Sequence, residues 1–144
     1  MQPWRERARS DRPLTVLVVD DEPEARLLIR LTLELDGCRV VEASGGLEAV
    51  RKARRIAPDV IVSDLRMPGI SGVETARLLS GLPGTRGIPR IAVTVEPPAR
   101  LDPDELRALF FDVVRKPFAP DRLRDAVREA AARDTGRMRA FPCG

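Results

Sequence analysis

Short apolar runs alternate with stretches of helical periodicity five times along the 144-residue chain, and this alternation limits the possible folds more than any other feature. The runs are rich in β-branched residues, which is typical of parallel strands that are buried on both faces. Such alternation favours a single α/β domain in which helices cover both faces of a parallel sheet. The expected strands cover residues 14–19, 38–42, 60–63, 91–94 and 113–115.

The segments between these strands carry helix signals. The first helix is expected to begin at Pro23 and to stop at Gly37, because proline suits the first turn of a helix and glycine ends one. The third is expected at about residues 73–79, and a short fourth helix begins late, near Pro103, with acids in its first turn. Three helices show an apolar face, made of Ala25, Leu28, Ile29, Leu31 and Leu35 in the first, Leu47, Val50, Ala53 and Ala57 in the second, and Leu123, Ala126, Val127 and Ala130 in the last, which covers about residues 119–133.

The composition excludes several kinds of chemistry. The chain contains no histidine, so His-ligated zinc sites, Ser-His-Asp triads and histidine general bases are ruled out. Its two cysteines, Cys38 and Cys143, form neither a disulfide framework nor a metal cluster. No apolar run approaches the roughly 20 residues that cross a bilayer, and the N-terminus lacks the apolar core of a signal peptide. We therefore expect a cytoplasmic protein that does not contact a membrane.

The number and distribution of the basic residues bear on which partners and site residues to expect. The net charge of +3 does not by itself indicate nucleic-acid binding, because the arginines are spread along the chain and tyrosine is absent. We expect no direct contact with nucleic acid. Lys52 and Lys116 are the only lysines among 25 basic residues, so a lysine at either position is an unusual choice.

Polar side chains stand at or just after the ends of four expected strands. Asp20 and Asp21 follow the first strand, Asp64 follows the third, Thr94 ends the fourth and Lys116 follows the fifth. The carboxyl ends of parallel strands meet at one edge of the sheet, where α/β proteins bind their ligands. Carboxylates that are brought together repel one another, and a hard divalent cation such as Mg²⁺ relieves that repulsion.

These residues are the parts needed to transfer a phosphoryl group to an aspartate. Asp64 is the best candidate nucleophile because it stands alone, whereas Asp20 and Asp21 suit a metal platform. Lys116 offers a compact cation and Thr94 a hydroxyl donor for phosphoryl oxygens. Each also has a structural reading: Asp64 as a turn residue, the paired acids as helix N-terminal charges, Thr94 as a strand residue and Lys116 as a surface lysine.

Taken together, the motifs resemble the receiver domain of bacterial two-component response regulators. The motifs are Asp20-Asp21 after VLVV, Asp64 in VIVSDLRMPG, Thr94 in IAVTV, and Lys116-Pro117-Phe118. Asp64 lies 43 residues after Asp21, Thr94 lies 30 residues after Asp64, and Lys116 lies 22 residues after Thr94, as is usual in that family. The resemblance covers residues 14–133, which are expected to form the receiver domain between an Arg-rich arm at 1–13 and a tail at 134–144.

The resemblance implies a flavodoxin-like fold with strand order 2-1-3-4-5. It also implies that Asp64 accepts a phosphoryl group from a histidine kinase or a phosphotransfer protein. Thr94 and Lys116 would contact the phosphoryl group and bias a loop rearrangement that partners read. The implied ligands of Mg²⁺ are Asp20, Asp21, Asp64 and the backbone carbonyl of Arg66.

We expect a stand-alone response regulator, not an enzyme, that acts in trans on a protein target and that can also form a homodimer. One alternative is a pseudo-receiver that binds its partners without phosphorylation. Another is an Mg²⁺-dependent phosphohydrolase with an aspartyl intermediate. The phosphohydrolase is disfavoured because such enzymes commonly carry an acid two residues after the nucleophile, where this chain has Arg66.

Some positions depart from the receiver pattern. Val113 stands where receivers usually carry an aromatic switch residue three positions before the lysine. Phe111 would share the face of Val113 only if the strand began there, and Phe110 is expected to point the other way. Val95 replaces a small residue after Thr94, which predicts slow turnover of the phosphoryl group. The late fourth helix predicts a specialised output surface.

Overall fold

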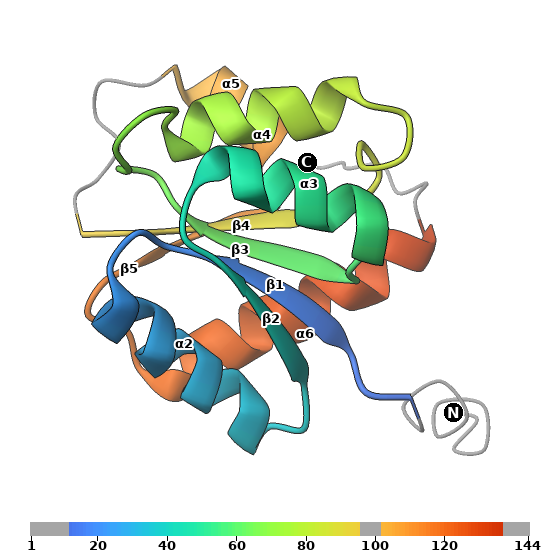
Figure 1. Cartoon of the computed structure of the whole chain (residues 1–144). Coiled ribbons are helices and arrows are strands. Elements are labelled where there is room, and N and C mark those ends of the chain that lie inside the picture. The colour runs from blue at the N-terminus through green and yellow to red at the C-terminus, as the bar shows by residue number, and fades with distance from the viewer. Residues whose placement is uncertain (1–11, 96–101, 137–144) are drawn as a thin grey trace.

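The computed structural model describes residues 12–95 and 102–136, which form a five-stranded parallel sheet in the order β2-β1-β3-β4-β5 (Figure 1). This arrangement confirms the expected flavodoxin-like α/β fold. The strands are β1 (Thr15–Val19), β2 (Arg39–Ala43), β3 (Val60–Asp64), β4 (Arg90–Thr94) and β5 (Asp112–Arg115). The helices are α2 (Pro23–Leu35), α3 (Gly46–Ile56), α4 (Gly72–Gly81), α5 (Pro103–Leu109) and α6 (Pro120–Gly136).

Helices cover both faces of the sheet. On one face, Val18 of β1 packs in a core with Leu33 of α2 and Leu123 of α6. On the other face, the neighbouring strand residue Leu17 packs in a core with Ala53 of α3, and α4 and α5 complete that layer. Successive residues of a strand point to opposite faces, so both faces of each strand must be apolar, as the sequence indicates.

The predicted apolar face of the first helix is wrong for most of its members. Ile29 is buried as expected, but the buried side of α2 is completed by Thr32 and Leu33. Leucine and isoleucine stand on most of the circumference of this helix, so periodicity alone does not decide which side meets the sheet. We call the exposed side the leucine face of α2, and its members, 48–85% exposed, are Leu27, Leu28, Leu31 and Leu35.

The predicted face of the second helix is also partly wrong. Ala53 of α3 is buried, but Leu47 is 60% exposed and Ala57 lies beyond the helix in the left-handed conformation, with φ of 53°. Small residues form the buried side and let α3 approach α4 closely. A Cβ atom on Gly46 would lie 2.2 Å from Thr75 Oγ1 of α4, so no larger residue fits at this contact.

The last two helices agree with the prediction more closely. The four predicted apolar residues of α6 are all buried, and the helix continues to Gly136, beyond its expected end. α5 begins at Pro103 as predicted, and the side chain of Asp102 caps it by accepting a 3.0 Å hydrogen bond from the amide of Asp104.

Parts of the expected arm and tail, together with Cys143, lie outside the described residues. Within the described part of the chain, no helix combines the length and the hydropathy of a membrane span.

Candidate functional site

Four adjacent strands bring the predicted site residues to one edge of the sheet. Asp20 follows β1, and Asp64 and Thr94 are the last residues of β3 and β4. Lys116 follows β5, and its amide donates a 2.8 Å hydrogen bond to the carbonyl oxygen of Thr94. Because β1, β3, β4 and β5 are neighbours in the sheet, residues far apart in the chain meet here.

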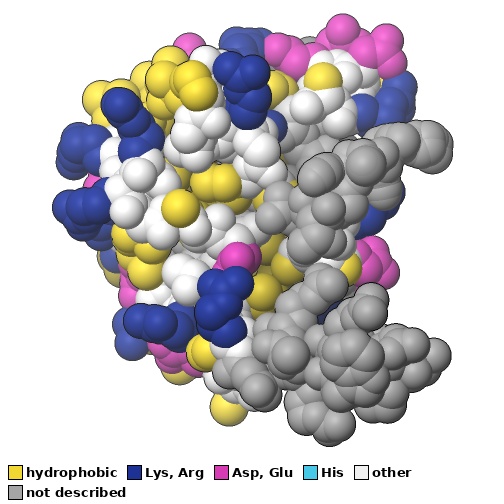
Figure 2. Space-filling model, turned by 90° about the vertical axis from the view of Figure 1, so that its right-hand side faces the viewer, with side chains coloured by type: hydrophobic (Ala, Val, Ile, Leu, Met, Phe, Trp, Pro, Cys, Tyr) yellow, Lys and Arg dark blue, Asp and Glu magenta, His cyan; other side chains and the backbone are white. Residues whose placement is uncertain are grey.

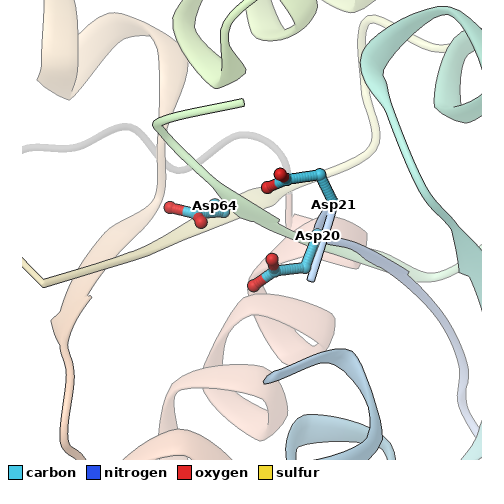
Figure 3. A group of neighbouring side chains, drawn as sticks. All are labelled: Asp20, Asp21 and Asp64. Carbon is cyan, nitrogen blue, oxygen red and sulfur yellow. The ribbon is translucent and has the colours of Figure 1, made fainter. Parts of the chain in front are cut away.

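The three acids converge as the sequence predicts. Side-chain oxygens of Asp20, Asp21 and Asp64 lie within 4.8 Å of one another, and Figure 3 shows the three carboxylates grouped at the strand ends. Asp20 is fully buried, and the other two are partly buried. An all-oxygen set of carboxylates, partly open to solvent, is the kind of site that suits Mg²⁺, which keeps several of its waters.

Lys116 lies against two of these acids. Its Nζ atom is 3.1 Å from Asp20 Oδ2 and 3.6 Å from Asp64 Oδ2, and its side chain is only 17% exposed. Burial by itself would lower the pKa of Lys116, but the hydrogen bond to Asp20 and the charges of both acids outweigh burial and raise it. Lys116 is therefore a fixed cation beside the acids.

Asp64 is less stable as an anion than an ordinary aspartate. Burial raises its pKa, although the backbone amide of Arg66, 3.2 Å from Asp64 Oδ1, and the charge of Lys116 oppose that rise. Burial is the largest cause of this rise and the charge of Asp20 adds to it, so a cation bound beside Asp64 would stabilise the ionised carboxylate.

The loop after Asp64 folds tightly back on it. Gly69 has a φ of 79°, which glycine adopts at no steric cost, and the Ser71–Glu74 capping box starts α4. A Cβ atom on Gly72 would lie 2.0 Å from the carbonyl oxygen of Asp64, so the start of α4 rests directly on the strand end. The sequence prediction missed this role of Gly72, although the capping-box motif could have located the start of the helix.

Two predicted contacts remain predictions. Thr94 is 1% exposed and stands beside Lys116, as expected, while its contact with a phosphoryl group awaits a test. The same holds for the carbonyl of Arg66 as a metal ligand. Val95 is 55% exposed, and its effect on phosphoryl turnover is likewise untested.

Of the two aromatic residues before β5, Phe111 lies as predicted and Phe110 does not. β5 begins at Asp112, so Phe111 precedes the strand and packs in the core beneath α2 and α6. Phe110 is 5% exposed and lies with Val113 in the core beneath α4 and α5, although the prediction pointed it the other way. The alternation of side chains between the two faces of a strand does not hold at Phe110, because this residue is the C-cap of α5 and lies before β5. The amide of Phe111 then donates to the carbonyl of Arg90.

The surface opposite the site carries separated charges. Figure 2 looks at the side from which the strands enter the sheet, and there Lys and Arg side chains alternate with hydrophobic and uncharged ones. The described residues of this face thus form no continuous basic surface of the kind that tracks a nucleic-acid backbone.

Comparisons with known proteins agree with this geometry. Residues 16–128 match the family model described as "Response regulator receiver domain". The transcriptional regulatory protein KdpE of Mycobacterium tuberculosis is 36% identical over 120 residues, which are 83% of this chain and 52% of that protein. An uncharacterised 14.6 kDa protein of Leptolyngbya boryana is 36% identical over 107 residues, 74% of this chain and 82% of its own. The chain thus spans about half the length of KdpE.

Solved structures are similar too. A response regulator receiver domain protein from Clostridium thermocellum superposes with a TM-score of 0.79 at 28% identity, covering 87% of this chain and 99% of its own. The receiver domain of the Pseudomonas aeruginosa sensor histidine kinase PA1611, solved with a magnesium ion coordinated in its active-site cleft, gives a TM-score of 0.75 at 29% identity. It covers 84% of this chain and 99% of its own.

Proposed function

Because the chain belongs to the response regulator receiver family, we propose that Asp64 accepts a phosphoryl group from a histidine kinase or a phosphotransfer protein. The observation that carries this proposal is the meeting of three carboxylates within 4.8 Å, with the ammonium group of Lys116 against two of them. The action of the protein on a target in trans, its homodimerisation and its cytoplasmic location remain predictions.

In the proposed reaction, a carboxylate oxygen of Asp64 forms a bond to phosphorus while the bond from phosphorus to the donor's imidazole nitrogen breaks. The imidazole keeps the electron pair of the broken bond. Lys116 moves from its carboxylate partners to a phosphoryl oxygen, and the hydroxyl of Thr94 donates to another. These two contacts draw the strand ends toward the new group, which is the change that a partner reads.

Asp20, Asp21 and Asp64 would hold Mg²⁺, together with the carbonyl of Arg66. When bound, the metal offsets the negative charge of the carboxylates and of the phosphoryl oxygens. The fit of the residues supports this assignment, since Asp20 is fully buried and its Oδ1 and Oδ2 atoms are already oriented by the amide of Glu22 and by Lys116.

The leucine face of α2 is the surface that we assign to the phosphodonor protein. α2 begins at Pro23, two residues after Asp21, and Arg26 of its first turn contacts Asp20, so this end of the helix forms part of the rim of the acidic site. A donor whose histidine reaches Asp64 has to cover this rim, and four exposed leucines provide apolar area for that contact.

One alternative function has a specific observation in its favour. Val113 occupies the position of the usual aromatic switch, and the nearby Phe110 is already buried, so an interaction module that works without phosphorylation is the second candidate. The phosphohydrolase is disfavoured by the exposed Arg66, which stands where such enzymes commonly have their second acid.

Labelling with acetyl phosphate and Mg²⁺, followed by intact-protein mass spectrometry, tests the proposal. We expect the wild-type chain to gain one phosphoryl group and the Asp64→Asn variant to gain none. No gain by the wild type would support the second candidate. A gain by the Asp64→Asn variant would show that another residue accepts the phosphoryl group. Sustained hydrolysis of a phosphate ester would support the phosphohydrolase alternative.

A further inference from the structure

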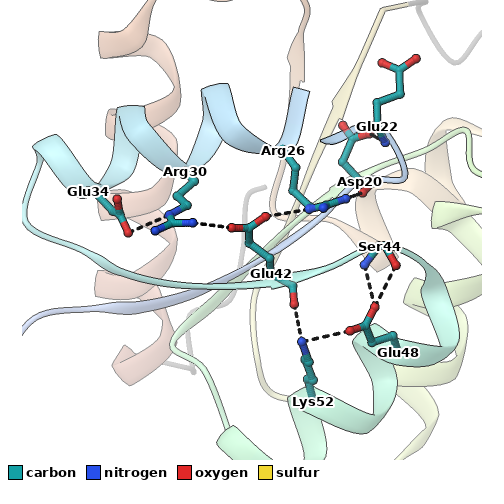
Figure 4. Close-up of polar contacts among 9 residues, drawn as sticks. All are labelled: Asp20, Glu22, Arg26, Arg30, Glu34, Glu42, Ser44, Glu48 and Lys52. Atoms are coloured by element: carbon teal, nitrogen blue, oxygen red, sulfur yellow. Dashed lines mark hydrogen bonds and ion pairs between the residues drawn. The ribbon is translucent and has the colours of Figure 1, made fainter. Parts of the chain in front are cut away.

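Arg26, at the end of the first turn of α2, contacts the backbone of the acidic site. Its Nη1 atom donates a 2.8 Å hydrogen bond to the carbonyl oxygen of Asp20, and its Nε atom lies 2.7 Å from Glu42 Oε1 on β2 (Figure 4). The side chain of Arg26 is only 18% exposed. One guanidinium group therefore joins the loop after β1 to the neighbouring strand.

The carbonyl of Asp20 belongs to the peptide unit that links Asp20 to Asp21. Holding this carbonyl fixes the rotation of that unit, and so the directions in which both carboxylates leave the backbone. The rest of the loop is bound as well: the amide of Asp20 donates to Ala43 O at 3.2 Å, and the amide of Glu22 donates to Asp20 Oδ1 at 3.0 Å. Among the described residues, Arg26 is the hydrogen-bond partner of the Asp20 carbonyl.

Glu42, the partner of Arg26, is itself held firmly. Arg30 Nη1 donates to Glu42 Oε2 at 2.8 Å, and Lys52 of α3 donates to the backbone carbonyl of Glu42 at 2.7 Å. The hydrogen bond from Arg26, opposed by burial and aided by Arg30, lowers the pKa of Glu42. The guanidinium of Arg26 is therefore held in place by the Glu42 carboxylate while it donates to the Asp20 carbonyl.

We propose that Arg26 is a positioning residue of the metal site, which holds the Asp20–Asp21 peptide in the orientation that brings the acids together. This inference rests on the proposed binding of Mg²⁺ by the acids. The charge of Arg26 and its contact with Asp20 have opposite effects on Mg²⁺ binding. The positive charge repels Mg²⁺, so removing the charge alone would tighten Mg²⁺ binding. Removing the hydrogen bond to the Asp20 carbonyl should instead weaken Mg²⁺ binding.

Arg30 provides the matched control, because it carries the same charge one turn later and binds the same Glu42, but its guanidinium pairs with Glu42 and Glu34 and not with Asp20. The full-length chain is titrated with Mg²⁺ by isothermal calorimetry, as wild type, Arg26→Met, Arg26→Lys and Arg30→Met. We expect Arg26→Met to weaken binding on the order of 10-fold and Arg26→Lys to weaken it less. Arg30→Met should weaken binding much less than Arg26→Met, or tighten it, because Arg30 reaches Asp20 only through Glu42. Binding by Arg26→Met that equals or exceeds that of Arg30→Met overturns the proposal.

Amide hydrogen exchange in the absence of metal gives a second readout. We expect the amide of Glu22, which bonds to the Asp20 side chain, to exchange faster in Arg26→Met than in Arg30→Met and wild type. Equal exchange in the three proteins overturns the positioning role. If the wild type binds no Mg²⁺, the proposed metal site fails, and the exchange comparison still decides whether Arg26 orders the loop. Arg26→Lys keeps the stem and the charge and carries the comparison if Arg26→Met does not fold.

Discussion

The ammonium group of Lys116 lies 3.1 Å from a carboxylate oxygen of Asp20, although the two residues are 96 positions apart in the chain. Asp20 is fully buried and the side chain of Lys116 is 17% exposed, so this ion pair lies largely away from solvent. The second contact of Lys116, 3.6 Å to Asp64, places the same cation beside the proposed acceptor.

Replacing Lys116 should separate metal binding from phosphorylation. We expect Lys116→Met to tighten Mg²⁺ binding, because a competing cation leaves the carboxylates, and to slow labelling by acetyl phosphate about 100-fold, because no cation meets the phosphoryl oxygens. Lys52→Met, which removes the other lysine, should leave labelling close to the wild-type rate, because Lys52 contacts Glu42 and Glu48 and not the three acids. Weaker Mg²⁺ binding by Lys116→Met would contradict this account.

Asp64 should lower the stability of the metal-free protein. Its pKa in the folded state is raised above the ordinary value of 3.8, so ionisation at neutral pH opposes folding, and this penalty disappears as the pH falls below both pKa values. We expect Asp64→Asn to melt at a higher temperature than wild type at pH 7 without Mg²⁺. The difference should shrink toward pH 4, and added Mg²⁺ should stabilise the wild type more than Asp64→Asn, which lacks one of the three carboxylates. An equal melting temperature at pH 7 would argue against the raised pKa.

Gly72 should tolerate no side chain. An alanine Cβ there would lie 2.0 Å from the carbonyl oxygen of Asp64 and 2.7 Å from Leu65 Cα, and backbone atoms cannot move aside easily. We expect Gly72→Ala to lower the free energy of unfolding in urea by about 1–3 kcal/mol and to weaken Mg²⁺ binding. Gly81→Ala, in the same helix with nothing within 4 Å, should be neutral.

The leucine face of α2 should matter for a protein donor and not for a small one. We expect Leu31→Asp to slow phosphoryl transfer from an autophosphorylated histidine kinase that labels the wild type, and to leave labelling by acetyl phosphate unchanged. Leu31 is 48% exposed, so the substitution should fold. Leu78→Asp on α4, at 46% exposure, is the control and should affect neither reaction. Equal loss with both donors would indicate damage to the pocket.

Cys38 should be a slow nucleophile in the folded protein. Burial, aided by the charge of Asp36, raises the pKa of its thiol to about 11 from 9.0. In a Cys143→Ser background, we expect iodoacetamide to modify Cys38 about 100-fold more slowly at pH 7.5 than in urea, because the thiolate is that much rarer. Comparable rates in both conditions would contradict the raised pKa.

Local sequence was enough to predict much of this protein. A parallel strand has to be apolar on both faces, so the strands are visible as β-branched runs, and the acids, threonine and lysine stand at their ends without any need for tertiary information. The apolar face of α6 was predictable for a related reason: its large apolar residues, Leu123 and Val127, occupy one side only, so just one orientation buries them.

Tertiary structure decided what the periodicity left open. α2 has leucines around most of its circumference, so only its packing against the sheet selects Ile29 and Leu33 for the core and leaves the leucine face outside. The side of the sheet that Phe110 joins depends on where β5 begins, and a hydrogen bond to a neighbouring strand sets that point. Arg26 and Gly72 act through contacts with the backbone of Asp20 and Asp64, and such contacts exist only once distant segments meet, which no local pattern records.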